Sequence, residues 1–390
     1  MTLAAEPWLR DPATQNVCAA LTAKGAQALF VGGCVRNALM GVPVSDIDIA
    51  TDATPEQVLT LAKAAGIKAI PTGIEHGTVT LVQNQIPHEV TTFRKDVATD
   101  GRRAVVAFST DIAEDAARRD FTMNAIYARP DGTIVDPLGG MADLVARRVR
   151  FIGTAENRIQ EDYLRTLRYF RFHAWYGDCA AGFDPDALAA IAGNLDGLSQ
   201  LSLERITGEI VKLLAAPDPA PAIASMRQIG VLGQILPGAD DRALGPVIHL
   251  QGLYPHRDDT SVDAICRLAA LGGSELLDHL RLSKAAARAL VQLREAASAT
   301  TSPAELSYRL GHDTALQAMT LRSALLEQPV LPDLGSDLAR GAAAKFPVKA
   351  ADLMPDLSGA ALGAALKQLE SAWIASGFTL GRAELLQQLK

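Results

Sequence analysis

The chain has 390 residues, 48% of them hydrophobic and 21% charged, and a formal net charge of −7 at pH 7. This length allows several compact units with a large buried core, and the composition excludes a disordered protein. The negative charge argues against a protein that coats nucleic acid by bulk electrostatics, so a nucleic-acid partner requires a local basic surface.

The sequence contains no recognisable targeting signal and no cysteine motif. No apolar run approaches the ~18 residues that a membrane helix needs. Residues 1–25 show neither the charged nor the apolar region of a signal peptide. The cysteines form no C-x-x-C pair, so neither a disulfide framework nor a structural zinc site is expected. We therefore expect a cytoplasmic protein that binds no membrane and has no obligate protein partner.

The first predicted elements are a strand, a glycine turn and a helix. Residues 28–31 are apolar, Gly32 and Gly33 allow a tight turn, and residues 35–40 form the first part of a helix. Free N–H groups at such a helix start bind phosphate, and Arg36 adds a charged donor. This arrangement predicts a phosphate-binding site.

An Asp-x-Asp sequence follows the glycine turn at Asp46 and Asp48. In a strand, residues two apart share a face, so both carboxylates are expected to point the same way. Such a pair is stabilised by a divalent cation, and oxygen ligands favour magnesium or manganese over zinc. A lone Asp-x-Asp is more often a solvated strand end. The glycine turn and Arg36 upstream favour a triphosphate held beside metal.

The next elements are a helix and a hairpin. Thr54, with proline after it, caps a helix that runs to about Ala65. Residues 78–82 and 89–93 predict a hairpin whose turn contains Pro87. Glu89 then supplies a third carboxylate, either as metal support or as a base, although an exposed edge-strand charge is the commoner role for such a residue. A second hairpin is predicted over residues 127–136, with its turn at Asp131 and Gly132.

Between the hairpins, residues 118–125 read RRDFTMNA. Arg119 is a candidate for binding triphosphate. Asp120 and Asn124 lie four apart, a spacing that would place them on one helix face within reach of a ribose hydroxyl. An arginine–aspartate capping network is the structural alternative, and the sequence leaves both open.

After Gly140 the chain becomes rich in Ala and Leu with helical periodicity, as in the apolar stripe of residues 206–214. Its densest basic element is EDYLRTLRYFRF, residues 161–172. On a helix, Asp162 and Arg165 would be neighbours. A carboxylate and a guanidinium together match the amino-bearing edges of C and A rather than the carbonyl edges of U and G.

At this point the residues resemble a known family. GGCVRNALMG with DID, HEVTTFR, RRDFTMNA and EDYLRTLR are similar, in order, to motifs of the class II tRNA nucleotidyltransferases. This family comprises CCA-adding enzymes and bacterial poly(A) polymerases and belongs to the DNA polymerase β superfamily. One departure is Asn37, where the family usually has aspartate.

The resemblance implies an α+β fold, with a nucleotidyltransferase head containing a mixed β-sheet and an all-helical neck, body and tail. We expect a head over residues 1–140, a neck and body that bind the base and RNA over 141–260, and a tRNA-binding tail over 261–390. By resemblance, Asp46 and Asp48 hold two Mg²⁺ ions for a two-metal mechanism, and Glu89 is the third catalytic carboxylate. The remaining residues implied to bind nucleotide are Gly32, Gly33, Arg36, Arg119, Asp120, Asn124, Asp162, Arg165, Arg168 and Arg171.

The activity implied is addition of the 3′-terminal CCA to tRNA from CTP and ATP. Residues 71–78 resemble the corresponding region of CCA-adding enzymes, and the Gly-Arg-Arg-Phe element of poly(A) polymerases is not found there. Residues 94–103 resemble the family's flexible loop, which CC-only enzymes lack. The alternatives are poly(A) or A-only addition, a catalytically silent RNA-binding protein, and a transferase acting on a small molecule.

Overall fold

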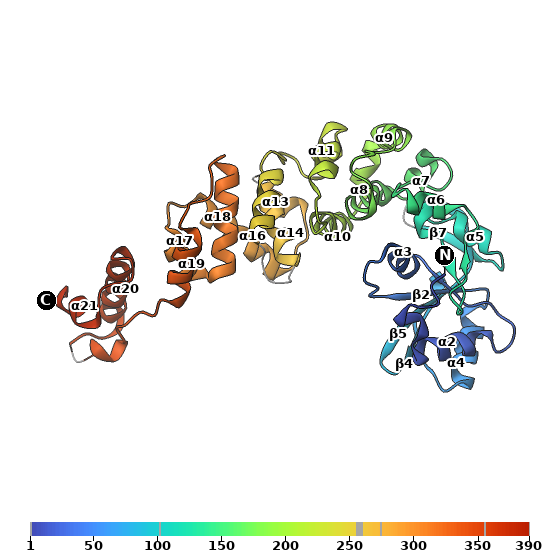
Figure 1. Cartoon of the computed structure of the whole chain (residues 1–390), viewed down its shortest axis with the longest axis horizontal. Helices are drawn as coiled ribbons and strands as arrows, with labels where there is room; N and C mark the ends of the chain where they lie inside the picture. Colours follow the sequence, from blue (N-terminus) through green and yellow to red (C-terminus); the bar gives the residue numbers. More distant parts are fainter. Residues whose placement is uncertain (1, 101–102, 255–259, 274, 355, 390) are drawn as a thin grey trace. The chain divides into compact units, whose positions relative to one another are not determined.

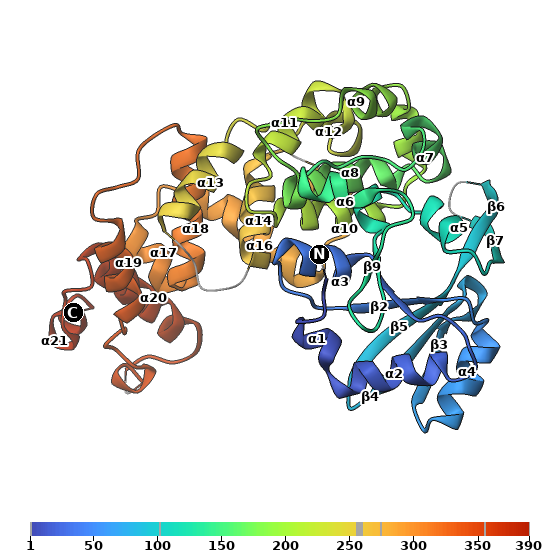
Figure 2. The same ribbon diagram turned by 45° about the vertical axis from the view of Figure 1, so that its right-hand side comes forward.

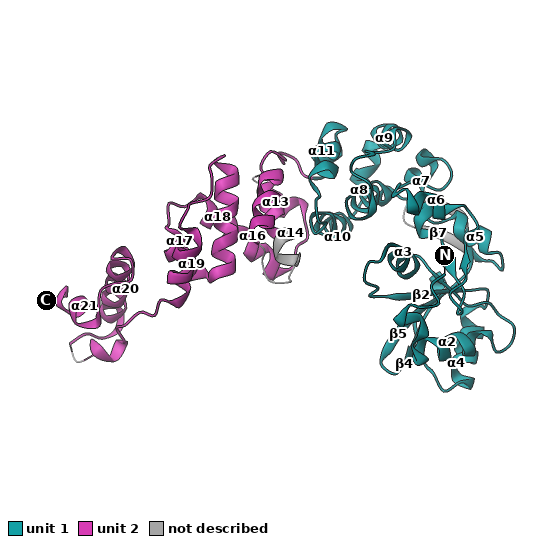
Figure 3. Ribbon diagram, viewed as in Figure 1, with its two compact units in different colours: residues 1–235 teal, residues 236–390 magenta. Residues whose placement is uncertain are grey.

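The computed structural model describes residues 2–100, 103–254, 260–273, 275–354 and 356–389. The chain divides into two compact units, Met1–Ile235 and Leu236–Lys390 (Figure 3). The predicted division at residues 140 and 260 concerns functional domains and stays a prediction. The combination of a mixed sheet with a largely helical remainder matches the predicted α+β class.

The first unit is built on a seven-stranded sheet in the order β3-β4-β5-β2-β1-β8-β9, part of which is seen in Figure 2. β2 and β5 are parallel and the other neighbouring pairs are antiparallel. The predicted mixed sheet is therefore confirmed. Its strands are β1 (Leu29–Val31), β2 (Ile47–Thr51), β3 (Lys68–Gly73), β4 (Thr78–Gln83), β5 (Ile86–Thr92), β8 (Tyr127–Ala128) and β9 (Ile134–Val135).

The parallel pair determines where the acidic residues lie. Asp48 is the register partner of Glu89, and the next pair, Ile49 and Val90, is buried. Asp46 lies one residue before β2 begins, so it precedes the strand rather than belonging to it. The sheet thus places two acidic positions side by side on neighbouring strands.

Two predicted hairpins are present, with small differences. β4 and β5 pair as expected, but their turn is Asn84–Gln85, both at positive φ, while Pro87 lies inside β5 and Glu89 in its middle. β8 and β9 form the second hairpin around Gly132. A separate two-stranded sheet, β6 (Arg94–Asp100) with β7 (Arg103–Phe108), covers the segment that resembles the flexible loop, whose Gly101 and Arg102 lie outside the described residues.

Helices α2 (Pro12–Thr22) and α4 (Pro55–Ala64) pack against each other and against strands β3 to β5 (Figure 1). The predicted start of α4 is confirmed, because Thr54 and Gln57 form a reciprocal capping box with proline at the first turn. The remaining helices of this unit are α1 (Pro7–Arg10), α3 (Gly33–Met40), α5 (Ile112–Ala117), α6 (Gly140–Val145), α7 (Ala155–Glu161), α8 (Leu164–Tyr176), α9 (Pro185–Ala192), α10 (Leu203–Leu214), α11 (Ala220–Gln228) and α12 (Val231–Ile235), with 3₁₀ turns η1 (Ile74–His76), η2 (Thr122–Asn124) and η3 (Leu195–Gln200).

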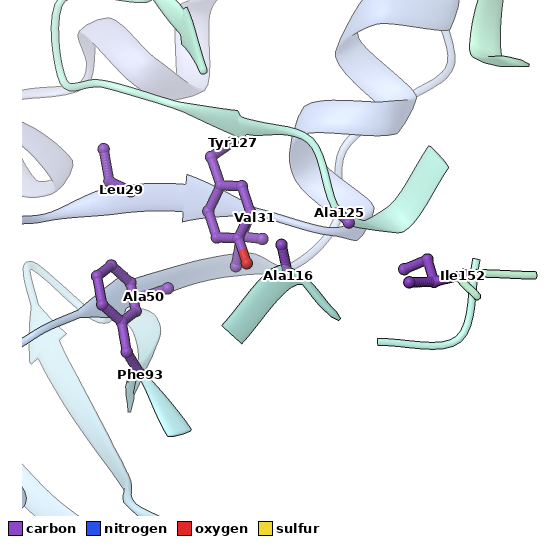
Figure 4. Close-up of a cluster of buried hydrophobic side chains, with 8 residues drawn as sticks. All are labelled: Leu29, Val31, Ala50, Phe93, Ala116, Ala125, Tyr127 and Ile152. Carbon is purple, nitrogen blue, oxygen red and sulfur yellow. The ribbon is translucent and has the colours of Figure 1, made fainter. Parts of the chain in front are cut away.

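One buried cluster joins the sheet to the segments that follow it. Leu29 and Val31 of β1 pack with Phe93, Ala116 and the fully buried Tyr127 (Figure 4). These residues come from strands β1 and β8, from the position directly after β5 and from α5. Burial of large apolar side chains therefore holds α5 and the RRDFTMNA segment against the strands that carry the acidic residues.

Every element of the second unit is helical within its described residues. Near its end, α20 and α21 form a small core around Leu369, Trp373 and Leu385. Among the described helices of both units, none is long and apolar enough to cross a bilayer. The helices of this unit are α13 (Leu244–Leu253), α14 (Thr260–Ala270), α15 (Leu276–His279), α16 (Lys284–Ser298), α17 (Pro303–Leu310), α18 (His312–Leu325), α19 (Leu334–Ala343), α20 (Gly359–Ala375) and α21 (Arg382–Gln387), with the 3₁₀ turn η4 (Ala350–Asp352).

Candidate active site

Three carboxylates lie near one another where β2 begins beside β5. Asp46 is exposed and accepts a hydrogen bond of 2.9 Å from Ser45, Asp48 is half-buried, and Glu89 is exposed on the adjacent strand. Partial burial and the negative charges of Glu89 and Asp46 raise the pKa of Asp48 to about 6, although the Arg119 guanidinium opposes this shift. The acidic residues are thus close enough to repel one another.

The donor set at this cluster fits a hard divalent cation. Carboxylate oxygens are the ligands that Mg²⁺ and Mn²⁺ prefer, and a cation would relieve the repulsion that raises the pKa of Asp48. Over the described part of the chain, no three His, Cys, Asp or Glu side chains group closely enough to hold one metal ion. The protein would therefore supply only part of the coordination shell, as is usual for Mg²⁺ beside substrate phosphates.

The glycine turn lies between β1 and α3. Gly32 has φ 73° and ψ −123°, a conformation that side-chain-bearing residues rarely adopt, and its carbonyl accepts the first helical hydrogen bond from Arg36 at 3.0 Å. A Cβ at Gly33 would lie 3.9 Å from Arg36 Nη2, and one at Gly32 would lie 3.8 Å from Arg119 Nη1. Two guanidinium groups therefore border the turn.

Arg36 is buried and is bound only by neutral groups. Its Nη1 donates to Asn124 Oδ1 at 2.6 Å and its Nη2 to the Tyr176 hydroxyl at 2.9 Å. Its guanidinium also lies 4.0 Å from the centre of the Tyr176 ring. No hydrogen bond from its guanidinium to a carboxylate is found among the described residues, so the positive charge is held in place without being neutralised.

Asn37, which departs from the family pattern, links Arg36 to the loop before β2. Its Oδ1 accepts from Arg36 Nε at 3.2 Å and Nη2 at 2.8 Å, while its Nδ2 donates to the Pro43 carbonyl at 3.0 Å. An aspartate here would still accept from Arg36 but would have no proton for the Pro43 carbonyl. The amide therefore connects the glycine turn to the segment that leads to Asp46.

Asp120 and Asn124 do meet, but through a different local structure from the one predicted. The helix face expected from their spacing is wrong, because α5 ends before Asp120 and η2 follows it. Asn124 donates to Asp120 at 2.9 Å, and Arg168 donates to the other Asp120 oxygen through Nε at 2.7 Å and also through Nη2. Asp120 is 8% exposed, so its carboxylate is engaged in a buried network that extends through Asn124 to Arg36.

The ring of Phe172 on α8 brings several arginines together. The guanidinium carbons of Arg36, Arg168 and Arg171 lie 5.1, 5.3 and 4.6 Å from its centre. Arg171 also donates to Glu209 of α10 at 2.6 Å. The contacts with the face of the ring orient the guanidinium groups without neutralising their charge.

Asp162 and Arg165 are close in sequence but do not share a helix. Asp162 lies in extended conformation after α7, and α8 begins only at Leu164, so the predicted single helix over this motif is wrong. Asp162 accepts from the Leu164 N–H at 3.1 Å and from Arg205 Nη2 at 2.7 Å.

Arg165 joins this motif to the RRD segment. Its Nη2 donates to the Arg118 carbonyl at 3.1 Å, its Nη1 donates to the Arg158 carbonyl at 3.0 Å, and it pairs with Glu161. Arg165, one of the two candidate base-reading residues, therefore contacts the backbone one residue before Arg119.

The sequence reasoning missed residues that support this network: Asp115, Tyr127, Tyr176 and Arg205. Asp115 lies in α5, four positions before Arg119, and this spacing is typical of an ion pair. Tyr176 and Arg205 reach their partners across 140 and 43 positions, so no local pattern signals them.

The chain has clear matches among known proteins. Residues 28–150 match the family described as the poly A polymerase head domain, and residues 182–242 match the one described as a probable RNA and SrmB-binding site of polymerase A. The human CCA tRNA nucleotidyltransferase 1, mitochondrial, is 36% identical, with the match covering 93% of this chain and 86% of the human one. The chain belongs to the tRNA nucleotidyltransferase and poly(A) polymerase family.

Two further relatives agree with this membership. A CCA-adding enzyme of Geobacillus thermodenitrificans is 41% identical over 57% of this chain and 54% of its own. The crystal structure of the Bacillus stearothermophilus CCA-adding enzyme in complex with CTP superposes with a TM-score of 0.74 at 29% identity, covering 93% of this chain and 92% of that one. A nucleotidyltransferase of this family requires a divalent metal, for which the Asp46–Asp48 pair has suitable oxygen ligands.

Proposed function

We propose that this protein adds the 3′-terminal CCA to tRNA, using CTP and ATP and releasing pyrophosphate. The observation that supports this most directly is the contact between Arg165 and the Arg118 carbonyl. It holds Arg165, a residue suited to reading a base, against the backbone one residue before Arg119, whose guanidinium borders the glycine turn. A nucleotide triphosphate held at that turn would have its base on the side of Asp162 and Arg165.

In this proposal each group of residues has one task. Asp46 and Asp48 would hold Mg²⁺, with Glu89 as the third carboxylate, and the bound metal would supply positive charge for the transfer of the nucleotidyl group. Gly32 and Gly33 let the triphosphate approach the backbone, where Arg36 and Arg119 face it.

The remaining residues hold the sugar and the base. Asp120 and Asn124 orient the ribose, directly or through Arg168. Arg171 adds positive charge beside the Phe172 ring. Asp162 accepts from the exocyclic amino group of C or A, and Arg165 donates to a ring nitrogen. The flexible loop would be the β6–β7 hairpin.

Alternatives within and outside the family make different predictions. Poly(A) or A-only addition uses the same chemistry, so it differs in which nucleotides are incorporated and when addition stops. A catalytically silent RNA-binding protein would incorporate nothing.

The cytoplasmic location also stays a prediction, and the similar human protein is named as mitochondrial.

The deciding experiment supplies tRNA lacking its 3′ end with single labelled nucleotides. We expect two C residues and then one A, after which addition stops. Asp46→Ala should lower incorporation by ~10²–10³-fold, the range seen when one group that stabilises transition-state charge is removed. Long A tracts on generic RNA would instead assign poly(A) addition, and undiminished turnover by Asp46→Ala would overturn the metal assignment.

A further inference from the structure

Asp115 is a buried carboxylate that no part of the proposed reaction uses directly. Its side chain is 1% exposed, and it accepts hydrogen bonds from Arg118 Nε at 2.9 Å, Arg119 Nη2 at 2.9 Å and the Tyr127 hydroxyl at 2.7 Å. A buried charge of this kind is costly unless it is fully paired. Here the pairing holds the arginine that borders the glycine turn.

Tyr127 completes the arrangement from the sheet side. Its ring is fully buried in the cluster of Figure 4, and its hydroxyl oxygen is directed to the side of α5. That oxygen also accepts from Arg119 Nε at 3.2 Å. The guanidinium of Arg119 is thus fixed along one edge by Asp115 and Tyr127, while its Nη1 faces the turn at Gly32.

This geometry distinguishes Arg119 from a mobile surface arginine. A long side chain loses up to ~2 kcal/mol of rotamer entropy when it is immobilised, and an arginine already held in position does not pay this on binding phosphate. We infer that Asp115 is a positioning residue for Arg119, which it orients, together with the Tyr127 hydroxyl, toward the triphosphate of the incoming nucleotide.

The inference rests on the proposed role of Arg119, and its test separates the two. The Kd of CTP is measured by calorimetry without tRNA for the wild type, Asp115→Asn, Arg119→Ala and the double variant. Asp115→Asn should raise the Kd about tenfold, the cost of one charged hydrogen bond that no longer orients its partner. In the Arg119→Ala background the same change should alter the Kd by less than about twofold, because its effect passes through Arg119.

A matched control removes the effect of lost stability. Asp143 is also buried, at 4% exposure, and is bound by Thr122 at 2.7 Å and Arg150 Nε at 2.8 Å. Asp143→Asn should lower the denaturation midpoint without changing the Kd of CTP. If Asp115→Asn does not fold, Tyr127→Phe replaces it and should raise the Kd about threefold, the cost of one neutral hydrogen bond.

The outcomes are distinct. Equal Kd values for the Asp115 and Asp143 variants, or fully additive effects in the double variant, would overturn the positioning role. An unchanged Kd for Tyr127→Phe would do the same where that variant is used. An unchanged Kd for Arg119→Ala would instead remove the phosphate role of Arg119 and with it the premise of the inference.

Discussion

At the scale of single residues, the candidate site consists of side chains that are already held by one another. Arg36 is bound by Asn37, Asn124 and Tyr176, and Asp120 is bound by Asn124 and Arg168. The sequence singled out Arg36, Asp120 and Asn124 as candidates from their residue types and motifs, and their roles stay predictions. It could not show that Arg36 binds Asn124 and Tyr176, because these partners lie 88 and 140 positions away along the chain.

Base selection is the first property to test at this scale. Asp162→Ala should reduce the preference for CTP over UTP and for ATP over GTP by ~10-fold or more, since one bidentate contact is worth ~1–3 kcal/mol of discrimination. Arg205→Ala keeps the carboxylate and removes only its ion pair, so a smaller loss is expected. The measurement is kcat/KM for each nucleotide. Unchanged selectivity in Asp162→Ala would exclude it as a base reader.

The acidic cluster predicts a pH dependence of metal binding. Because the pKa of Asp48 is raised to about 6, its carboxyl is protonated below that pH and cannot bind a cation. The apparent affinity for Mn²⁺, followed by electron paramagnetic resonance, should fall about tenfold per pH unit below pH 6 and level off above it. Constant affinity between pH 5 and 7 would contradict this expectation.

Glu89→Gln provides the control for that titration. The negative charge of Glu89 raises the pKa of Asp48, so removing this charge should move the midpoint of the pH dependence to lower pH. An unmoved midpoint would mean that Glu89 does not act on Asp48 through its charge.

At the scale of elements, local signals predicted what local interactions determine. The capping box at Thr54 and the Asp131–Gly132 turn involve residues within a few positions of each other, so both could be found in the sequence. The break between α7 and α8 could not. A Cβ at Gly197 would lie 1.9 Å from the Tyr163 ring, so this ring packs directly on the backbone of a distant 3₁₀ turn.

A second element-scale contact stabilises the helical unit. Arg322 of α18 donates to the carbonyls of Ala296 at 2.8 Å and Ala297 at 3.1 Å, which lie in the last turn of α16. It also donates to the carbonyl of Thr301 at 3.0 Å, which follows that helix. Helix ends leave such carbonyls without helical partners. Arg322→Ala should therefore lower the free energy of unfolding by about 3 kcal/mol, measured by urea denaturation.

The matched control for that variant is Arg309→Ala. Arg309 forms an ion pair with Glu305 one helical turn away, and 45% of its side chain is exposed. Such pairs contribute at most about 1 kcal/mol. Equal losses in the two variants would show that Arg322 does not act by binding the end of α16.

At the scale of the whole molecule, the sequence predicted the order of an α/β part and a helical part, and the structure has both. Hydrophobic periodicity carries this information because it records which faces are buried. It does not record where compact units separate, which depends on contacts summed over the whole chain. The boundary after Ile235 falls within the helical region, where composition does not change.

The ring of Phe172 has a consequence for how a net-negative protein attracts a polyanion. Arg36, Arg168 and Arg171 contribute their charges around it. Asp120 pairs with Arg168 and Glu209 pairs with Arg171, so among the residues that the structure describes Arg36 has no ion-pair partner. In a chain of net charge −7, such a local excess of positive charge favours the approach of a phosphate group. An incoming triphosphate would act as the missing counter-ion, so that part of its binding energy comes from neutralising a charge that folding left uncompensated.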